Sequence, residues 1–262
     1  MARAKSTSTV SLVALTGGLA LAAAACAQQS QSDPRYAVHD MSRPQPPLVS
    51  PGTSSTQDAV GTAPSDAIVL FDGTDLSKWS DGSGEARWRL VDGEIESVPG
   101  GGYLVTRDAF GDCQLHLEWM VPEDLVPRGG AGANSGVYLM QQYEVQILRR
   151  EQRPTYPDGM AGSIYGQHPP LAAPDLPKGA WNTFDILFTA PRFNDDGSVK
   201  APAYCTVLFN GVVVQNHAEI FGQTAGGQPP SYVAHPSKMP ISIQDHGDRI
   251  RFRNIWIRPL GN

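Results

Sequence analysis

Glycine and proline interrupt the chain so often beyond residue 65 that a long helix has no room to form. The sequence holds 27 Gly and 22 Pro residues, and these divide residues 66–262 into apolar runs about ten residues apart. No run keeps the helical spacing of apolar residues over about three turns. Asp92-Gly93 and Asn210-Gly211 are dipeptides that favour two-residue hairpin turns. The sequence therefore predicts an all-β sandwich of short antiparallel strands.

The predicted strands are short apolar or alternating runs bounded by turn residues. They are Ile68–Phe71, Trp88–Val91, Glu94–Val98, Tyr103–Thr106, Gln114–Met120, Ser135–Met140, Tyr143–Leu148, Ser163–Tyr165, Trp181–Thr189, Ala203–Phe209, Val212–Asn216, Met239–Gln244 and Ile250–Arg258. Three long connections separate some of them, at Val121–Ala133, Arg149–Gly162 and Gly222–Lys238. Connections of this length are more often functional than idle, so we expect them to rim a groove over one sheet.

The first 25 residues are predicted to be an export signal rather than part of the fold. Arg3 and Lys5 give a positively charged start, and Val10–Leu21 is an apolar run interrupted only by small residues. The run is too short to span a bilayer as a helix. The chain is therefore expected to be exported.

A cysteine directly follows the signal, and its placement resembles a lipobox, in which cleavage precedes a cysteine that becomes lipidated. Cys26 comes after three alanines, although Ala23 stands where that motif usually has Leu. Several acyl chains would hold the protein at a membrane, and Ala27, rather than Asp, after the cysteine resembles outer-membrane sorting. We expect a lipoprotein of the outer membrane, on its periplasmic or cell-surface side. Cleavage after Ala25 or Ala27, with Cys26 incidental, is the alternative.

Composition divides the rest of the chain into a linker and one domain. Residues 27–65 are rich in Ser, Gln, Pro, Thr and Gly, which is typical of a flexible tether. The predicted organisation is a signal peptide (1–25), a lipidated cysteine with a linker (26–65) and a folded domain (66–262). Residues 1–25 hold two of the 20 Lys and Arg residues, leaving 18 against 26 Asp and Glu. An acidic chain without a basic run is a poor nucleic-acid binder, so no nucleic-acid partner is expected.

Two cysteines remain in the predicted domain, Cys113 and Cys205, each within an apolar strand-like run. An oxidising compartment permits a disulfide between them, and two separate buried thiols are the alternative. Neither has the Cys or His spacing of a zinc site.

Residues 134–148 carry polar side chains on one face of a predicted strand pair with a turn at Gln141-Gln142. Alternation puts Glu144 and Gln146 on one face of the second strand and its apolar residues on the other, with Tyr138 on the polar face of the first strand. A carboxylate, an amide and a phenol suit a polyhydroxylated ligand, because hydroxyls need donors and acceptors and sugar rings stack on aromatic rings. The solvated face of an antiparallel sheet is the alternative.

The order of motifs along residues 67–260 identifies a family. It runs Leu70-Phe71-Asp72-Gly73, Asp92-Gly93, Leu115-His116-Leu117-Glu118-Trp119, Asn134-Ser135-Gly136-Val137-Tyr138, Tyr143-Glu144-Val145-Gln146-Ile147, Ser163-Ile164-Tyr165-Gly166, Trp181-Asn182-Thr183-Phe184, Asn210-Gly211 and Gln244-Asp245-His246-Gly247. This order resembles the 3-keto-disaccharide hydrolase domain family. The resemblance implies a concanavalin A-like lectin/glucanase sandwich, or jelly roll. Relatives often carry Arg where this chain has Met120 and Met140, so its specificity is expected to differ if those Arg residues contact ligand.

The resemblance also implies action on sugars already oxidised to a ketone at C3, as a 3-keto-glucoside 1,2-lyase that hydrates the resulting 3-keto-2-hydroxyglucal. The ketone acidifies the C2 proton because the carbanion delocalises as an enolate, which then expels the C1 oxygen. Such a site needs a base, donors or a cation at the C3 oxygen, and an acid for the leaving group. A separate oxidoreductase must supply the keto sugar.

Three residues are predicted to be catalytic. Glu144 is the first candidate for the base or a hydroxyl ligand, with a structural salt bridge as the alternative. His246 is a candidate acid or base that could also polarise the C3 oxygen, with a capped surface histidine as the alternative. Arg251 could stabilise an enolate, or pair with a carboxylate. The predicted substrate-binding residues are Glu118, which is also the rival carboxylate, Asn134, Tyr138, Gln146, Tyr165, Gln244 and Arg253.

Two acidic turns raise the question of a divalent cation, either calcium or a catalytic metal at the C3 oxygen. Asp245, His246 and Asp248 lie within four residues of one another, and Asp72 and Asp75 flank Gly73. Tight-turn chemistry is the alternative explanation for both groups.

Two further functions fit a lectin-like sandwich. A non-catalytic carbohydrate-binding module would keep the groove without a tuned base. A conventional glycoside hydrolase would need paired carboxylates, and the Glu-x-Asp-x-x-Glu strand motif typical of lectin-fold glucanases is not found in this sequence.

The predicted anchor can be tested by labelling a Gram-negative host with radioactive palmitate. We expect the wild-type chain and the control Cys113→Ala to incorporate label, and Cys26→Ser to incorporate none, because only Cys26 follows a signal sequence. An unlabelled wild-type chain whose mature N-terminus is residue 26 or 28 by mass spectrometry would contradict the prediction.

Overall fold

A computed structural model describes residues 35–126, 133–149 and 155–260. The chain divides into two units, Met1–Pro47 and Leu48–Asn262. The predicted signal peptide and Cys26 lie outside the described residues, as do parts of the connections at 121–133 and 149–162. No helix among the described residues is long and apolar enough to cross a membrane.

The second unit is built almost entirely from strands. They are β1 (Ile68–Phe71), β2 (Trp79–Ser80), β3 (Arg89–Val91), β4 (Glu94–Glu96), β5 (Leu104–Phe110), β6 (Cys113–Met120), β7 (Ala133–Leu139), β8 (Tyr143–Arg149), β9 (Asn182–Thr189), β10 (Arg192–Phe193), β11 (Val199–Ala201), β12 (Ala203–Phe209), β13 (Val212–Ile220), β14 (Met239–Ile243) and β15 (Arg251–Pro259). The described residues also include a short 3-10 helix, η2 (Pro157–Gly159). Most of these strands were predicted from the sequence; β2, β10 and β11 were not. The predicted strand at Ser163–Tyr165 makes only isolated bridges, through Ile164.

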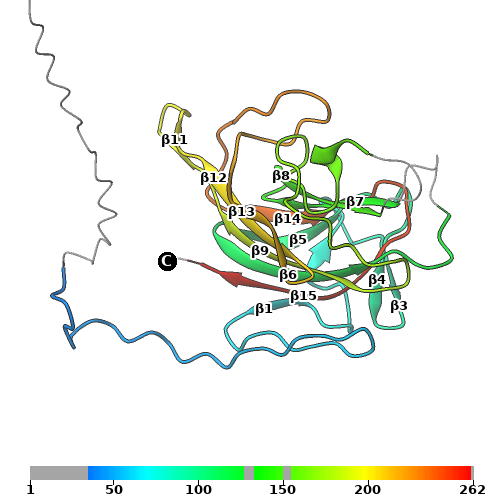
Figure 1. The fold of residues 1–262 in the computed structure, drawn as a ribbon, viewed down its shortest axis with the longest axis horizontal. Helices are drawn as coiled ribbons and strands as arrows, with labels where there is room; N and C mark the ends of the chain where they lie inside the picture. The colour runs from blue at the N-terminus through cyan, green and yellow to red at the C-terminus, as the bar shows by residue number, and fades with distance from the viewer. Residues whose placement is uncertain (1–34, 127–132, 150–154, 261–262) are drawn as a thin grey trace, which may run out of the picture. The chain divides into compact units, whose positions relative to one another are not determined.

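Two antiparallel sheets form the layers of a sandwich. The 8-stranded sheet has the order β13-β12-β9-β6-β15-β4-β3, with β1 paired to β15, and the 5-stranded sheet has the order β2-β5-β14-β7-β8. Figure 1 shows the two layers face to face, with β7, β8 and β14 in one and β6, β9 and β15 in the other. This arrangement confirms the all-β sandwich.

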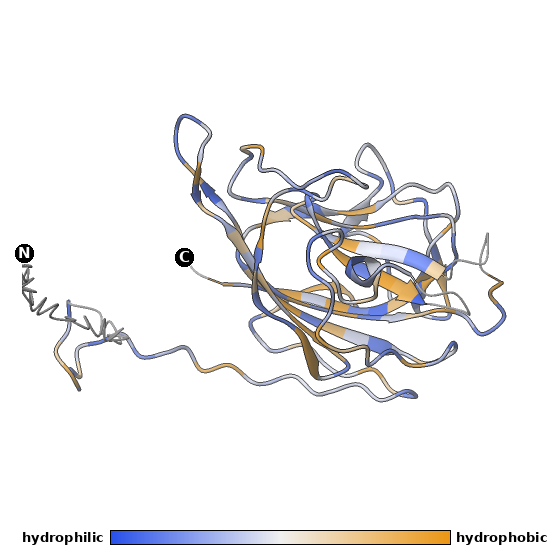
Figure 2. Ribbon diagram, turned by 45° about the horizontal axis from the view of Figure 1, so that its top comes forward, coloured by the Kyte–Doolittle hydropathy of each residue, from blue (hydrophilic) through white to orange (hydrophobic). Residues whose placement is uncertain are grey.

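The core lies between the two sheets and takes alternate residues from each strand. On β6 it takes Leu115, Leu117 and Trp119, and on β8 it takes Val145 and Ile147, all fully buried. Figure 2 shows the apolar residues as bands along the strands, whereas many connecting loops are hydrophilic. Because the side-chain period of a strand is two, this burial sends the intervening residues to the outer face of each sheet.

Residues with positive φ form the tight hairpins. Asp92 and Gly93 join β3 to β4, and Asn210 and Gly211 join β12 to β13, as the sequence predicts for two-residue turns. The β7–β8 turn is centred one residue earlier than predicted, since Met140 and Gln141 have φ of 54° and 56°.

Cys113 and Cys205 are buried free thiols. Both are paired in register with Phe188 of β9, one from each side, so an entire strand separates them. Two inter-strand spacings amount to about 9–10 Å, which exceeds the reach of a disulfide. The sequence left open a disulfide or two separate buried thiols, and the structure shows two separate thiols.

The folded unit starts earlier than the composition predicts. The tether was expected to run through residue 65, but the compact unit begins at Leu48. The Ser55 hydroxyl donates to Glu118, the Arg253 guanidinium donates to the Thr56 carbonyl (2.6 Å), and Gln57 exchanges two hydrogen bonds with the Trp181 backbone. Polar residues thus pack through hydrogen bonds to a polar sheet face, which is why a search for apolar residues misses them.

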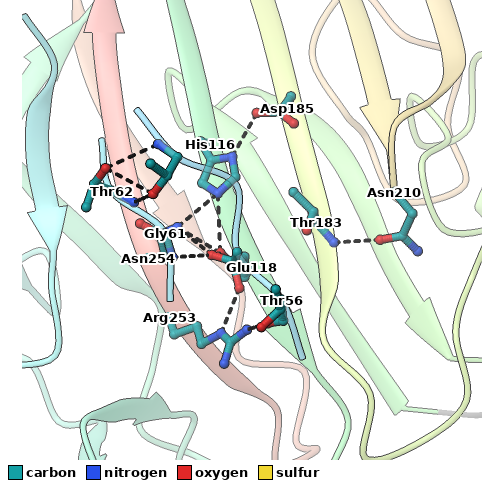
Figure 3. Close-up of polar contacts among 12 residues, drawn as sticks. Thr56, Gly61, Thr62, His116, Glu118, Thr183, Asp185, Asn210, Arg253 and Asn254 are labelled. Carbon is teal, nitrogen blue, oxygen red and sulfur yellow. Dashed lines mark hydrogen bonds and ion pairs between the residues drawn. The ribbon is translucent and has the colours of Figure 1, made fainter. Parts of the chain in front are cut away.

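The segment 53–62 covers a charged cluster on the outer face of the 8-stranded sheet (Figure 3). Glu118 accepts from Arg253 (2.7 Å) and Asn254 (2.8 Å), and His116 contacts Asp185 (2.8 Å). Burial alone would raise the pKa of Glu118, but hydrogen bonds from His116, Ser55, Asn254 and Arg253 lower it to about 2. Burial would likewise lower the pKa of His116, but its bonds to Asp185 and Glu118 raise it to about 9. At neutral pH the cluster is therefore ionised and internally paired.

Removing this cover should destabilise the sandwich. A chain that begins at residue 48 should unfold at a higher temperature than one that begins at residue 66. The shorter chain lacks the Ser55 hydroxyl that donates to Glu118, and it exposes the charges of Glu118 and Arg253 to competition from water. Differential scanning calorimetry measures the difference. In the longer chain, Ser55→Ala should cost about 1–3 kcal/mol, whereas the control Asp58→Ala, at an exposed position of the same segment, should change little. Equal melting temperatures for the two chains would contradict this account.

Candidate functional site

A cavity of about 190 Å³ opens on the outer face of the 5-stranded sheet, opposite to the face that packs in the core. It is lined by Asn134, Tyr138, Glu144, Gln146, Tyr165, Thr224, Gly226, Gln244 and His246. Seven of these are residues that the sequence analysis selected. The structure thus brings together side chains from β7, β8, the end of β14 and two loops.

Strand alternation and one glycine place Glu144 in this cavity. The neighbours of Glu144 on β8, Tyr143 and Val145, belong to the core, so its carboxylate must point outward. There it lies over Gly136 of β7, where an added Cβ would be only 2.2 Å from Glu144 Oε1. Any other residue at Gly136 would displace the carboxylate.

A chain of hydrogen bonds crosses the cavity floor. The Tyr138 hydroxyl donates to Glu144 Oε2 (2.8 Å), and the Gln244 amide donates to the hydroxyls of Tyr103 (3.0 Å) and Tyr138 (3.3 Å). The Gln146 amide, in the orientation that satisfies its neighbours, donates to Glu144 Oε1 (3.2 Å). The carboxylate is therefore held by neutral donors on both oxygens.

Glu144 is a buried carboxylate with a strongly shifted pKa. Burial raises its pKa to about 7, and the hydrogen bond from Tyr138 lowers it only in part. A carboxylate with a pKa near neutrality is a stronger base than an ordinary glutamate and is still ionised in a useful fraction at pH 7. Burial next to Glu144 also raises the pKa of Tyr138, so its phenol stays a proton donor.

Two of the lining residues carry buried side-chain oxygens that lack a partner within the described protein. Asn134 Oδ1 and Gln244 Oε1 are buried acceptors without a hydrogen bond among the described residues. His246 is exposed on the same lining. Unpaired buried acceptors are costly unless water or a ligand satisfies them, so hydroxyl groups of a bound molecule fit here.

Backbone contacts fix the walls of the cavity. The Tyr165 amide donates to the Glu144 carbonyl (3.1 Å), which places this segment along the edge of β8, and the Glu144 amide donates to Thr224 Oγ1 (3.0 Å). Sequence reasoning missed Thr224 and Gly226 as lining residues. The length of the connection Gly222–Lys238 was the signal that pointed to them.

Arg251, predicted from the sequence as a catalytic residue, does not line this cavity. It lies at the start of β15 in the 8-stranded sheet and forms ion pairs with Glu94 (3.0 Å) and Glu96 (3.0 Å). Arg251 therefore corresponds to the alternative in the sequence analysis, an arginine that pairs with carboxylates.

Glu118 and Arg253, predicted from the sequence as substrate-binding residues, do not line this cavity either. They form a buried ion pair (2.7 Å) on the outer face of the other sheet, beneath the segment 53–62. Arg253 also stacks on Trp181, with 4.2 Å from its guanidinium carbon to the ring centroid. Alternation along a strand indicates which residues share a face, but it does not say which sheet carries them.

Met120 and Met140, the two positions at which the sequence analysis expected a difference in specificity, lie away from the cavity lining. Met120 is on the outer face of β6 and pairs in register with Arg251, while Met140 is buried in the β7–β8 turn. Neither lines the cavity.

Among the described residues, no group of three or more His, Cys, Asp or Glu side chains could hold a metal ion. Asp245 uses both oxygens on backbone amides, those of Gly100 (2.7 Å), Gly102 (3.3 Å) and Gly247 (2.9 Å). Asp72 accepts from the amide and hydroxyl of Thr74. These contacts fit turn chemistry, and the donor set here does not fit a cation held by carboxylates.

Known proteins resemble this chain over most of its length. Residues 66–258 match the 3-keto-alpha-glucoside-1,2-lyase-like domain. A 3-keto-disaccharide hydrolase of Bacteroides thetaiotaomicron is 24% identical and aligns with 74% of this chain and 78% of its own. The crystal structure of a candidate glycosyl hydrolase from Parabacteroides distasonis, 43% identical, covers 85% of this chain and 97% of its own with a TM-score of 0.79. A second from the same organism, 24% identical with a TM-score of 0.54, covers 74% and 99% and shares the fold.

Titration of the unliganded protein should reveal the shifted carboxyl. Carbon-detected NMR of glutamate carboxyls should show one group with a midpoint near pH 7, which Glu144→Gln removes. Tyr138→Phe should move that midpoint upward, because the variant loses the donor that favours the ionised form. Glu85→Gln, at an exposed position, is the control and should leave the midpoint in place. Ordinary titration of every glutamate in the wild type would refute this assignment.

Proposed function

Because the chain belongs to the family of 3-keto-alpha-glucoside-1,2-lyase-like domains, we propose that it cleaves glycosides whose glucosyl ring carries a ketone at C3. The name of its Bacteroides relative and the glycosyl hydrolase description of its Parabacteroides relative support action on a glycosidic bond. The observation that carries the proposal is the buried carboxylate of Glu144, with a pKa raised to about 7 by burial, inside a cavity lined by amides and phenols.

In the proposed reaction, Glu144 removes the proton from C2 of the bound 3-keto sugar. The electron pair of that C–H bond passes to the C3 oxygen as an enolate. It then returns to form the C1–C2 double bond while the bond from C1 to the leaving oxygen breaks. That oxygen takes a proton, and the product on the sugar side is 3-keto-2-hydroxyglucal. Addition of water at C1, with a proton returned to C2, completes net hydrolysis.

The other lining residues have roles that follow from their chemistry. Amide donors next to the sugar would stabilise the developing charge on the C3 oxygen, and Asn134 offers such a donor. The unpaired oxygens of Asn134 and Gln244 would accept sugar hydroxyls. His246 is exposed on the lining and is the candidate acid for the leaving oxygen. Tyr138 and Gln146 orient the base through their bonds to its two oxygens.

This mechanism needs one base of tuned pKa instead of the carboxylate pair of ordinary glycosidases. Glu118, the rival carboxylate in the sequence analysis, lies on the outer face of the other sheet, and its hydrogen bonds lower its pKa to about 2. A carboxylate with so low a pKa is a weak base.

The setting of the reaction is proposed on chemical grounds. A glucosyl ring carries a hydroxyl at C3, so a separate oxidoreductase must supply the ketone. We propose that the protein is exported and held at the outer membrane by lipid on Cys26, where it would meet imported glycans.

Activity can be tested on 3-keto-trehalose and 3-keto-β-glucosides against their unoxidised parents, by following release of 3-keto-glucose. We expect only the keto forms to be cleaved. Glu144→Gln should lower kcat by about 10²–10⁴-fold, the usual contribution of a general base. The value of kcat/KM should rise as pH rises through about 7, because the base acts in its ionised form. Parallel reactions with a chelator test for a divalent cation.

Two outcomes would overturn the proposal. Binding of the sugars without turnover of any keto form would indicate a carbohydrate-binding module. Cleavage of the unoxidised parents at comparable rates would indicate a conventional glycoside hydrolase. Glu85→Gln is the matched control, since its carboxylate is exposed and is not part of the cavity lining.

A further inference from the structure

A second and larger cavity, of about 540 Å³, lies next to the one that holds Glu144. Its walls come from residues 156–167 and 223–230, and the proposed mechanism gives most of these residues no role. The residues that matter for its chemistry are Tyr156, Asp158, Tyr165, Gln223, Gln228 and Pro229.

The two cavities share a wall. Tyr165 lines both of them. Residues 223–227 alternate between them, with Thr224 and Gly226 on the smaller cavity and Gln223 and Ala225 on the larger. Hydrogen bonding to Tyr156 and burial raise the pKa of Tyr165, and the charges of Glu144 and Asp158 add to this, which fits a phenol between the two cavities. The two cavities are therefore adjacent, with Tyr165 and residues 223–227 between them.

The larger cavity is framed by fixed contacts. The Gln167 side chain donates to the Gly222 carbonyl (3.0 Å) and accepts from the Phe221 amide (2.7 Å), and the Gln223 amide donates to the Ser231 carbonyl (3.0 Å). Gly222 has a φ of 146°, and a Cβ there would meet the Ser231 backbone at 2.3 Å. The base of the loop is closed by backbone contact, as expected of a pocket formed before its ligand arrives.

The lining combines ring faces with hydrogen-bonding groups. Tyr156 and Tyr165 pack edge to face, with 6.0 Å between centroids, and their hydroxyls are 2.6 Å apart. The Tyr156 ring lies over Gly159, where a Cβ would come within 2.1 Å of it, so the ring can take this position only because residue 159 is a glycine. Gln223, Gln228 and Asp158 add amide and carboxylate groups around these rings. Such a lining suits a six-membered ring whose face packs on tyrosine and proline and whose hydroxyls bond to amides.

We propose that the cavity bounded by Tyr156, Tyr165, Gln228 and Pro229 binds the leaving group of the reaction, a hydroxylated six-membered ring attached to C1 of the keto sugar. The inference rests on the proposed function. The ring of the leaving group can come from two sources, a second pyranose or a phenol. A leaving group without a ring, such as methanol, would leave this cavity unfilled and would gain nothing from it.

The test compares three substrates that share the 3-keto-glucosyl ring: its methyl glycoside, its glycoside with a second glucose, and its p-hydroxyphenyl glycoside. The purified full chain is used, with the variants Tyr156→Ala and Gln228→Ala. The measured quantity is the ratio of kcat/KM for a ring-bearing substrate to kcat/KM for the methyl glycoside. We expect each variant to lower this ratio about tenfold, as loss of about 1.4 kcal/mol of ring contacts or hydrogen bonds would.

A lower ratio for the disaccharide identifies a sugar subsite, and a lower ratio for the aryl glycoside identifies a phenol subsite; either supports the proposal.

The control Val233→Ala, an exposed residue outside both linings, should keep the wild-type ratio. Unchanged ratios in both variants, with wild-type turnover of the methyl glycoside intact, would overturn the leaving-group cavity alone. Absence of turnover of all three keto substrates by the wild type would overturn the proposed function and this inference with it. Circular dichroism verifies that each variant is folded.

Discussion

Burial of one face of every strand is the constraint on which the rest of the structure depends. The core takes Val145 and Ile147 from β8, and this choice alone sends Glu144 to the outer face. A slip of one residue in the pairing of β8 would put the carboxylate into the core and an aliphatic side chain into the cavity. The same hydrophobic pattern that closes the sandwich therefore sets the position of the candidate base.

Two buried glutamates show that burial does not by itself make a base. Glu118 and Glu144 are both almost inaccessible to solvent, on opposite outer faces of the sandwich. Glu118 receives several hydrogen bonds, one of them from the Arg253 guanidinium, and its pKa is about 2. The donors that the described residues direct at the Glu144 carboxylate are neutral, and its pKa is about 7. The difference lies in the hydrogen bonds: His116, Ser55, Asn254 and Arg253 together outweigh the burial of Glu118, whereas the bond from Tyr138 offsets the burial of Glu144 only in part.

Sequence patterns predicted the sandwich and most of its cavity because both follow from local rules. Alternation along β8 and the turn residues determine which side chains share a face, and that was sufficient for Glu144, Gln146 and Tyr138. The patterns could not assign Arg251 to a sheet, since period two is the same on every strand and pairing between distant strands is a tertiary property. They also missed Thr224, whose role depends on a hydroxyl that meets the β8 backbone across 80 residues of sequence.

The attachment of residues 53–62 to the back of the 8-stranded sheet has a mechanical consequence. Tension applied to the chain ahead of Leu48 would enter the sandwich through the hydrogen bonds that this segment makes to Glu118, Arg253 and Trp181. Those bonds belong to the layer that does not carry Glu144. A pull from the N-terminal side would thus be absorbed by one sheet, while the geometry around the carboxylate in the other stays unloaded.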